Sequence, residues 1–140
     1  MKNIKLSALI FLSFFLGCTG SRESNQQKLQ KGIYDEVMAI HDEIMPKMSK
    51  IMTLEKDLES LIQDSLVQKN PEQIKEIESQ IARLKDADEA MMHWMRNFQV
   101  NHEGWPHDSI MSYLSKEKDE VSKVRDQMLD AISGAEELVN

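Results

Sequence analysis

The chain has 140 residues, of which 29% are charged, and its formal net charge at pH 7 is −7. Nucleic-acid binders concentrate Lys and Arg on one face, so this acidic balance excludes that class and we expect no nucleic-acid partner. Because there is only one cysteine, no disulfide can form within the chain, and packing has to stabilise the fold.

The N-terminus has the layout of a secretory signal. Two lysines precede an apolar run over residues 6–16, which is about half the length that a membrane span needs. The tetrad FLGC at residues 15–18 resembles the bacterial lipobox, which is cut before a cysteine that already carries diacylglycerol. We predict a signal peptide over residues 1–17, lipidation of Cys18, and a flexible tether over residues 18–24.

Lipidation predicts a location in the cell envelope. Two or three acyl chains hold a protein on a bilayer almost permanently, so we expect a lipid-anchored chain that faces the periplasm. Thr19 follows the cysteine in place of an acidic residue, which favours the outer membrane over the inner one. The alternative is an ordinary signal peptide cut near Gly20. Loss of residues 1–17 would remove two lysines and no acidic residue, leaving 123 residues with a net charge of −9.

Residues 25–140 predict one all-α domain, because apolar residues recur there at heptad spacing in three stretches. The expected helices cover about 25–68, 71–100 and 108–138. The expected inward residues are Val37, Ile40, Ile44, Met48, Ile51, Leu54, Leu58, Leu61; Ile74, Ile77, Ile81, Leu84, Met91, Met95, Phe98; and Met111, Leu114, Val121, Val124, Met128, Ile132, Ala135 and Leu138.

Several residues predict where these helices bend or end. Pro46 lies within the first stripe without changing its phase, so we expect one long kinked helix, with two separate helices as the alternative. Asn70 and Pro71 form an N-cap followed by proline at the first helical position. Asp108 is the expected N-cap of the third helix, and Gly134 is expected to fray its end.

Short connections between amphipathic helices predict an antiparallel three-helix bundle with coiled-coil-like packing. The first helix is the longest, so we expect it to extend beyond the bundle at its N-terminal end. The alternative is an elongated two-helix coiled coil that dimerises through a loosely attached third helix, and a homo-oligomer is therefore possible.

Methionines gather at one level of the expected bundle. If the first turn lies near residues 69 and 70, antiparallel pairing places Met48 opposite Met91 and Met45 opposite Trp94. Thioether and imidazole ligands suit Cu(I), and haem accepts a His and Met pair. The candidate ligands are His41, Met45, Met48, Met91 and Met95.

Core packing is the favoured interpretation of these methionines, since Met commonly fills gaps in cores. We expect Met48, Met91 and Met95 to be buried, Met45 and Met52 to be more exposed, and no cofactor to be bound. A surface that docks a partner protein is the next alternative.

Two other features need an interpretation. Asp88 at an inward position invites a catalytic role, but no nucleophile of matching register accompanies it. We expect it to pair with Lys118 or Arg125, or to face water. Trp94 and Trp105 flank the second connection, and we expect them to hold it against the end of the bundle.

The segments HDEIMPKM (residues 41–48) and ADEAMMHWMRNF (residues 87–98), behind a lipobox, resemble a family of small lipoproteins from Bacteroidota-type bacteria. Some members carry the automatic name "viral A-type inclusion protein", which reflects only coiled-coil similarity. The resemblance implies a helical envelope lipoprotein and supplies no activity. Asp is common in the family where His93 stands, so it implies no ligand role for His93.

These observations predict a non-enzymatic binding or structural module that is anchored to the bilayer through Cys18 and binds another envelope protein. The alternative function is a periplasmic carrier of Cu(I) or haem that uses the methionine-rich layer.

Overall fold

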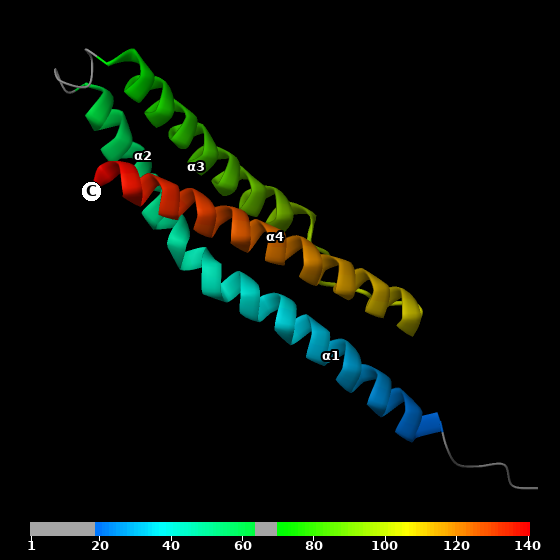
Figure 1. Ribbon diagram of the computed structural model, residues 1–140. Helices are drawn as coiled ribbons and strands as arrows, with labels where there is room; N and C mark the ends of the chain where they lie inside the picture. The colour runs from blue at the N-terminus through cyan, green and yellow to red at the C-terminus, as the bar shows by residue number, and fades with distance from the viewer. Residues whose placement is uncertain (1–18, 64–69) are drawn as a thin grey trace, which may run out of the picture.

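The computed structural model describes residues 19–63 and 70–140, and these residues form helices and connections without any strand. The elements are, in chain order, α1 (Thr19–Ile44), a 3₁₀ turn η1 (Met45–Lys47), α2 (Met48–Ile62), α3 (Pro71–Asn97) and α4 (His107–Val139). Figure 1 shows them packed against one another in an elongated bundle. The prediction of an all-α fold with three helices, the first in joined pieces, is confirmed.

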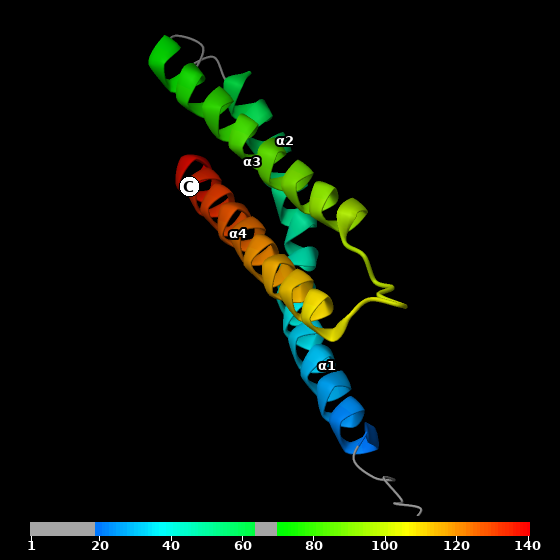
Figure 2. The same cartoon turned by 90° about the vertical axis from the view of Figure 1, so that its right-hand side faces the viewer.

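The first three elements run in one direction, α3 returns beside α2, and α4 turns back again (Figures 1 and 2). The last helix packs against α1, α2 and α3. In both views the first turns of α1 extend beyond the other helices. The expected N-terminal extension of the first helix is therefore present.

Pro46 changes the helix type for a single turn and leaves the first helix continuous. The backbone at Ile44 and at Lys47 keeps right-handed helical torsions, and the N–H of Met48 bonds to the carbonyl of Met45. Proline supplies no N–H and crowds the carbonyl four residues earlier, and a 3₁₀ turn relieves both problems locally. The predicted kinked helix is therefore an α1–η1–α2 rod, not two separate helices.

The two ends of this rod differ from the prediction. Helix α1 is described from Thr19 onward, so residues 19–24 are helical where a flexible tether was expected. The Gln, Lys and Leu residues that follow at positions 26–31 favour helix, and no proline separates them from residues 19–24. At the other end, α2 finishes at Ile62, and the N–H of Gln63 bonds to the carbonyl of Ser60 at 3.1 Å. The predicted continuation to residue 68 falls mainly on residues 64–69, which lie outside the described part.

The start of α3 confirms the predicted cap. The Asn70 side chain accepts a hydrogen bond from the N–H of Gln73 at 3.3 Å, and Pro71 occupies the first helical position. The helix ends at Asn97, three residues before the predicted end. Phe98 leaves the helical region with ψ of 120°, and the next N–H, that of Gln99, donates to the Tyr113 hydroxyl at 2.7 Å. A contact with α4 therefore replaces the last helical turn.

Both predictions for the ends of α4 were wrong in detail. The helix begins at His107 directly after Pro106, and no side chain caps it. Asp108 therefore lies in the first turn, where its charge interacts favourably with the helix dipole. At the other end the helix continues through Gly134 to Val139, and Gly134 lies against the side chain of Gln80.

The core follows the predicted heptad stripes with a few additions. Most of the expected inward residues are buried, and half-buried residues of the same stripes pack around them. Ala87 and Ala131 are also buried. They lie next to Asp88 and Ile132, which were the predicted inward positions. The buried core residues include Val37, Ile44, Ile51, Leu54, Leu58, Ile77, Ile81, Leu84, Met91, Trp94, Val121, Met128, Ile132 and Ala135.

One polar side chain lies inside this core. Gln80 is 6% exposed, and its amide Nε2 donates to the carbonyl of Ala131 at 2.7 Å. A buried amide is tolerated when it is hydrogen-bonded. The absence of a side chain at Gly134 leaves the space that the amide occupies.

Exposed ion pairs join α4 to the rod. Lys118 pairs with Glu36 of α1, and Lys50 of α2 pairs with Glu136. Each such exposed pair contributes only about 0–1 kcal/mol. They favour one alignment of the helices more than they stabilise the fold.

Candidate functional site

The predicted lipidation site, Cys18, lies outside the described residues, immediately before α1. In the helix that follows it, the side-chain Nε2 of Gln30 lies 3.0 Å from Nδ1 of His107. At 1.5 Å per residue, Thr19 is therefore about 16 Å along the helix from that contact. Within residues 19–63 and 70–140, no helix combines the length and the apolar character that crossing a membrane requires.

The methionines of the predicted layer differ widely in burial. Met91 is fully buried at 0% exposure and Met52 is 55% exposed, as predicted. Met48 and Met95 were predicted to be buried and are only half-buried, as is Met45. These three side chains pack against the core cluster and are only partly covered by it. Core packing therefore fully explains the presence of Met91. It explains Met45, Met48, Met52 and Met95 only in part.

The predicted alignment of the layer is close to the observed one. Met91 belongs to the core cluster and Met48 packs against it. The Trp94 ring lies against His41, with ring centres 5.7 Å apart, one helical turn from the predicted partner Met45.

His41 connects two of the candidate ligands. Its ring nitrogen Nδ1 is 2.9 Å from Oδ1 of Asp42, and its other nitrogen, Nε2, is 3.4 Å from Sδ of Met95. The imidazole side chain is 18% exposed. The structure thus places an imidazole and a thioether from different helices in direct contact. The spacing of these residues in the sequence does not by itself predict that contact.

The flank formed by α2 and α3 is partly apolar and partly acidic. Glu59 lies 3.8 Å from Lys85 across the two helices. One heptad along both helices, Met52 and Met92 occupy the equivalent positions, and they are 55% and 37% exposed. We call Met52 and Met92 the methionine flank.

Acidic side chains lie beside the methionine flank. Burial raises the pKa of the Glu55 carboxyl above its ordinary value of 4.5, Lys85 lowers it, and the nearby charges of Asp88 and Glu59 raise it further. Glu55, Glu59 and Asp88 therefore lie close enough to one another and to Lys85 for their charges to interact. These three carboxylates favour positive charge on a ligand that binds beside them.

Of the two settings predicted for Asp88, the structure shows no ion pair with Lys118 or Arg125, and it leaves the carboxylate partly open to water. Lys118 pairs with Glu36 and Arg125 pairs with Asp126, so neither cation forms the predicted pair with Asp88. The buried stripe passes through Ala87, and Asp88 is half-buried beside it, near Glu55. The small side chain of Ala87 occupies the buried position, so the Asp88 carboxylate lies at the edge of the stripe.

Aromatic side chains hold the second connection against the bundle. Trp94 is buried and stacks on Phe98, with ring centres 4.9 Å apart, and Phe98 stacks on Tyr113 at 6.2 Å. Trp105 meets Tyr113 and His102 edge-on at 5.6 and 5.3 Å. The predicted role of the two tryptophans is confirmed, and Tyr113, which the sequence analysis did not single out, lies between them. Burial raises the pKa of the Tyr113 hydroxyl, although the Gln99 N–H opposes the shift.

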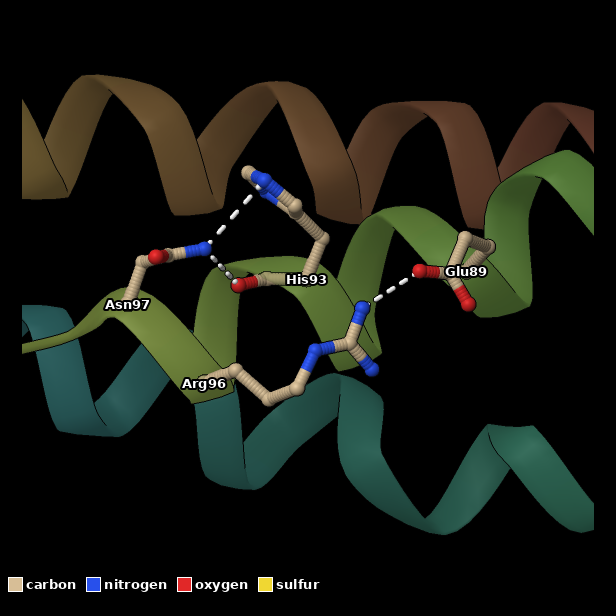
Figure 3. Close-up of polar contacts among 4 residues, drawn as sticks. All are labelled: Glu89, His93, Arg96 and Asn97. Atoms are coloured by element: carbon tan, nitrogen blue, oxygen red, sulfur yellow. Dashed lines mark hydrogen bonds and ion pairs between the residues drawn. The ribbon is translucent and has the colours of Figure 1, made fainter.

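A groove of about 740 Å³ lies between α3 and α4, and Trp94 forms part of its wall. Figure 3 shows polar contacts along its α3 side. The Asn97 side chain bridges to the carbonyl and ring of His93 at 2.8 and 3.2 Å, and Arg96 pairs with Glu89. All of these contacts join residues of one helix, one or two turns apart, so they stabilise the end of α3.

Among the described residues, no three His, Cys, Asp or Glu side chains gather closely enough to hold a metal ion. The single His and Met contact at His41 is the arrangement that the candidate ligands form. Comparison of the chain with protein-family models, with curated proteins and with solved structures finds no match.

Proposed function

We propose that this protein is a lipid-anchored, periplasm-facing binding module of a bacterial envelope, without enzymatic activity. The acyl chains on Cys18 attach it to the bilayer, and the outer membrane is the favoured one. The methionine flank binds another envelope protein. The observation that carries the proposal is the exposure of Met52 and Met92 on adjacent helices, beside a group of carboxylates.

The anchor proposal agrees with the geometry of α1. The helix is described from Thr19, the residue after Cys18 in the sequence, and it projects beyond the other helices (Figure 2). A lipid at residue 18 would therefore hold the rest of the bundle away from the membrane surface. A binding face on the far part of the rod, where α2 and α3 lie, would then be open to partners in the periplasm.

The flank favours a particular kind of partner. Methionine is flexible and polarisable, so exposed methionines adapt to apolar side chains of different shapes. The carboxylates of Glu55, Glu59 and Asp88 favour positive charge close to that apolar contact. A helix with one apolar face and Lys or Arg along its edges satisfies both requirements.

Substitution at the cysteine tests the anchor. Cys18→Ser removes the thiol that accepts diacylglycerol, so acyl labelling should disappear and the precursor should stay uncut. Thr19→Ser is the matched control and should be labelled and processed normally. Mature, cleaved protein from Cys18→Ser would contradict the lipobox.

Photo-crosslinking tests the binding face. A photoreactive residue at Met52 of the lipidated chain, activated in intact cells, should give a discrete adduct that Met92→Glu diminishes. The same photoreactive residue at Leu129, which is exposed on α4, is the matched control and should not give that adduct. An identical adduct from Leu129, or an adduct at Met52 that Met92→Glu leaves unchanged, would contradict a specific surface.

A further inference from the structure

We propose that His41 and Met95 bind a soft monovalent metal ion of the Cu(I) class. The imidazole of His41 reaches across from α1 to the thioether of Met95 on α3, and the two donor atoms, Nε2 and Sδ, are 3.4 Å apart. The proposal concerns a different ligand from the protein partner of the methionine flank. The metal-binding proposal does not depend on whether the methionine flank binds a protein.

The hydrogen bond at the other ring nitrogen decides what the imidazole presents to the sulfur. Oδ1 of Asp42 is 2.9 Å from Nδ1 of His41, and a carboxylate is an acceptor, so it holds a proton on Nδ1. In the neutral ring, Nε2 then carries a lone pair directed at the thioether, which is itself only a weak acceptor. Two electron-pair donors do not stabilise each other, whereas a cation between them binds to both.

This arrangement matches the way in which proteins prepare histidine for metal binding. A ligating histidine almost always donates its second ring N–H to a carboxylate, a carbonyl or water, which fixes the tautomer and raises the basicity of the ligating nitrogen. Asp42 occupies this supporting position toward His41. The thioether of Met95 adds the soft donor that selects Cu(I) over harder divalent ions.

The distance between the donors is also suitable. With metal–nitrogen and metal–sulfur bonds of about 2.1 and 2.3 Å, an edge of 3.4 Å gives an angle of about 100° at the metal. A third thioether is available within one helical turn of each ligand, from Met45 after His41 or from Met91 before Met95. The Trp94 ring, 5.7 Å from the imidazole centre, shields this side of the site, while the 18% exposure of His41 leaves a path for the ion.

Titration with Cu(I) under anaerobic conditions tests the proposal. The sample is the full chain in detergent with Cys18→Ser, so that no thiol competes, and a chromogenic Cu(I) chelator reports the metal that the protein removes. We expect one equivalent of Cu(I) per chain, with both nitrogen and sulfur in the first coordination shell by X-ray absorption. His41→Gln or Met95→Leu should weaken the affinity more than about 100-fold, and Asp42→Asn should weaken it by about 10- to 100-fold.

Matched controls separate a built site from general methionine binding. Met52→Leu and His93→Gln change the same residue types elsewhere on the bundle and should leave the affinity unchanged. Met95→Leu conserves side-chain volume, so the helical circular dichroism of that variant should match the parent. Failure to take Cu(I) from the chelator, equal binding by the His41→Gln and Met95→Leu variants, or a metal shell without sulfur would each overturn the proposal.

Discussion

Replacing Gly134 with alanine should destabilise the protein, although the same change normally stabilises a helix. An added Cβ at this position would lie 2.9 Å from Oε1 and 3.1 Å from Nε2 of Gln80. The first distance requires the Gln80 amide to shift, and the second requires it to give by a few tenths of an ångström. Because Gln80 is buried and has little room to move, we expect the shift to break the bond from Nε2 to the Ala131 carbonyl, which is 2.7 Å long.

The magnitude follows from two opposing effects. Alanine is favoured over glycine inside a helix by about 1 kcal/mol. Loss of a hydrogen bond that leaves a buried amide without a partner costs about 1–3 kcal/mol. We therefore expect Gly134→Ala to lower the free energy of unfolding by about 1 kcal/mol, the difference between these two central values.

Chemical denaturation followed by helical circular dichroism measures this effect, and a double-mutant cycle isolates its cause. In a Gln80→Ala background nothing remains to be displaced, so Gly134→Ala should stabilise by about 1 kcal/mol and the coupling should reach about 2 kcal/mol. Gly32→Ala is the control, because no atom lies within 4 Å of the Cβ that it adds. A Gly134→Ala variant that gains as much stability as Gly32→Ala, with coupling below about 0.5 kcal/mol, would refute the reasoning.

Other substitutions follow from the same contacts. Met91→Ala should lower the free energy of unfolding by about 2–5 kcal/mol because the side chain is fully buried, whereas Met52→Ala should change it by less than about 0.5 kcal/mol; equal losses in denaturant titrations would contradict the observed burial. Burial raises the pKa of Glu55 in the folded state, so the folded chain holds this proton more tightly than the unfolded chain and stability falls as pH rises through the folded-state pKa. Glu55→Gln should therefore stabilise the protein at pH 7 and give no such gain below the ordinary pKa of 4.5, and a gain that persists in acid would contradict this cause. Tyr113→Phe removes the acceptor for the Gln99 N–H and should cost about 0.5–1.5 kcal/mol; unchanged unfolding and unchanged amide exchange at Gln99 would show that the bond contributes nothing.

The heptad pattern determines the helical architecture independently of any single tertiary contact. A stripe that repeats every three to four residues can be buried only on one side of a helix, and three such stripes with short connections leave few ways to pack. Asn70 with Pro71 determined the start of α3 for a similarly local reason, since the cap involves only residues within one turn. Pro46 also acts locally, although the sequence left open whether the helix would bend or separate.

Tertiary contacts decided the features that depend on two helices at once. The sequence placed Gly134 near a fraying helix end, but the fit of the Gln80 amide makes it a core position. The contact of His41 with Met95 depends on how α1 and α3 are rotated and shifted relative to each other. The pattern of apolar residues along the chain does not specify either quantity. Half-burial of Met48 and Met95 has the same origin, because periodicity gives the direction of a side chain while the neighbouring helix determines how much of it is covered.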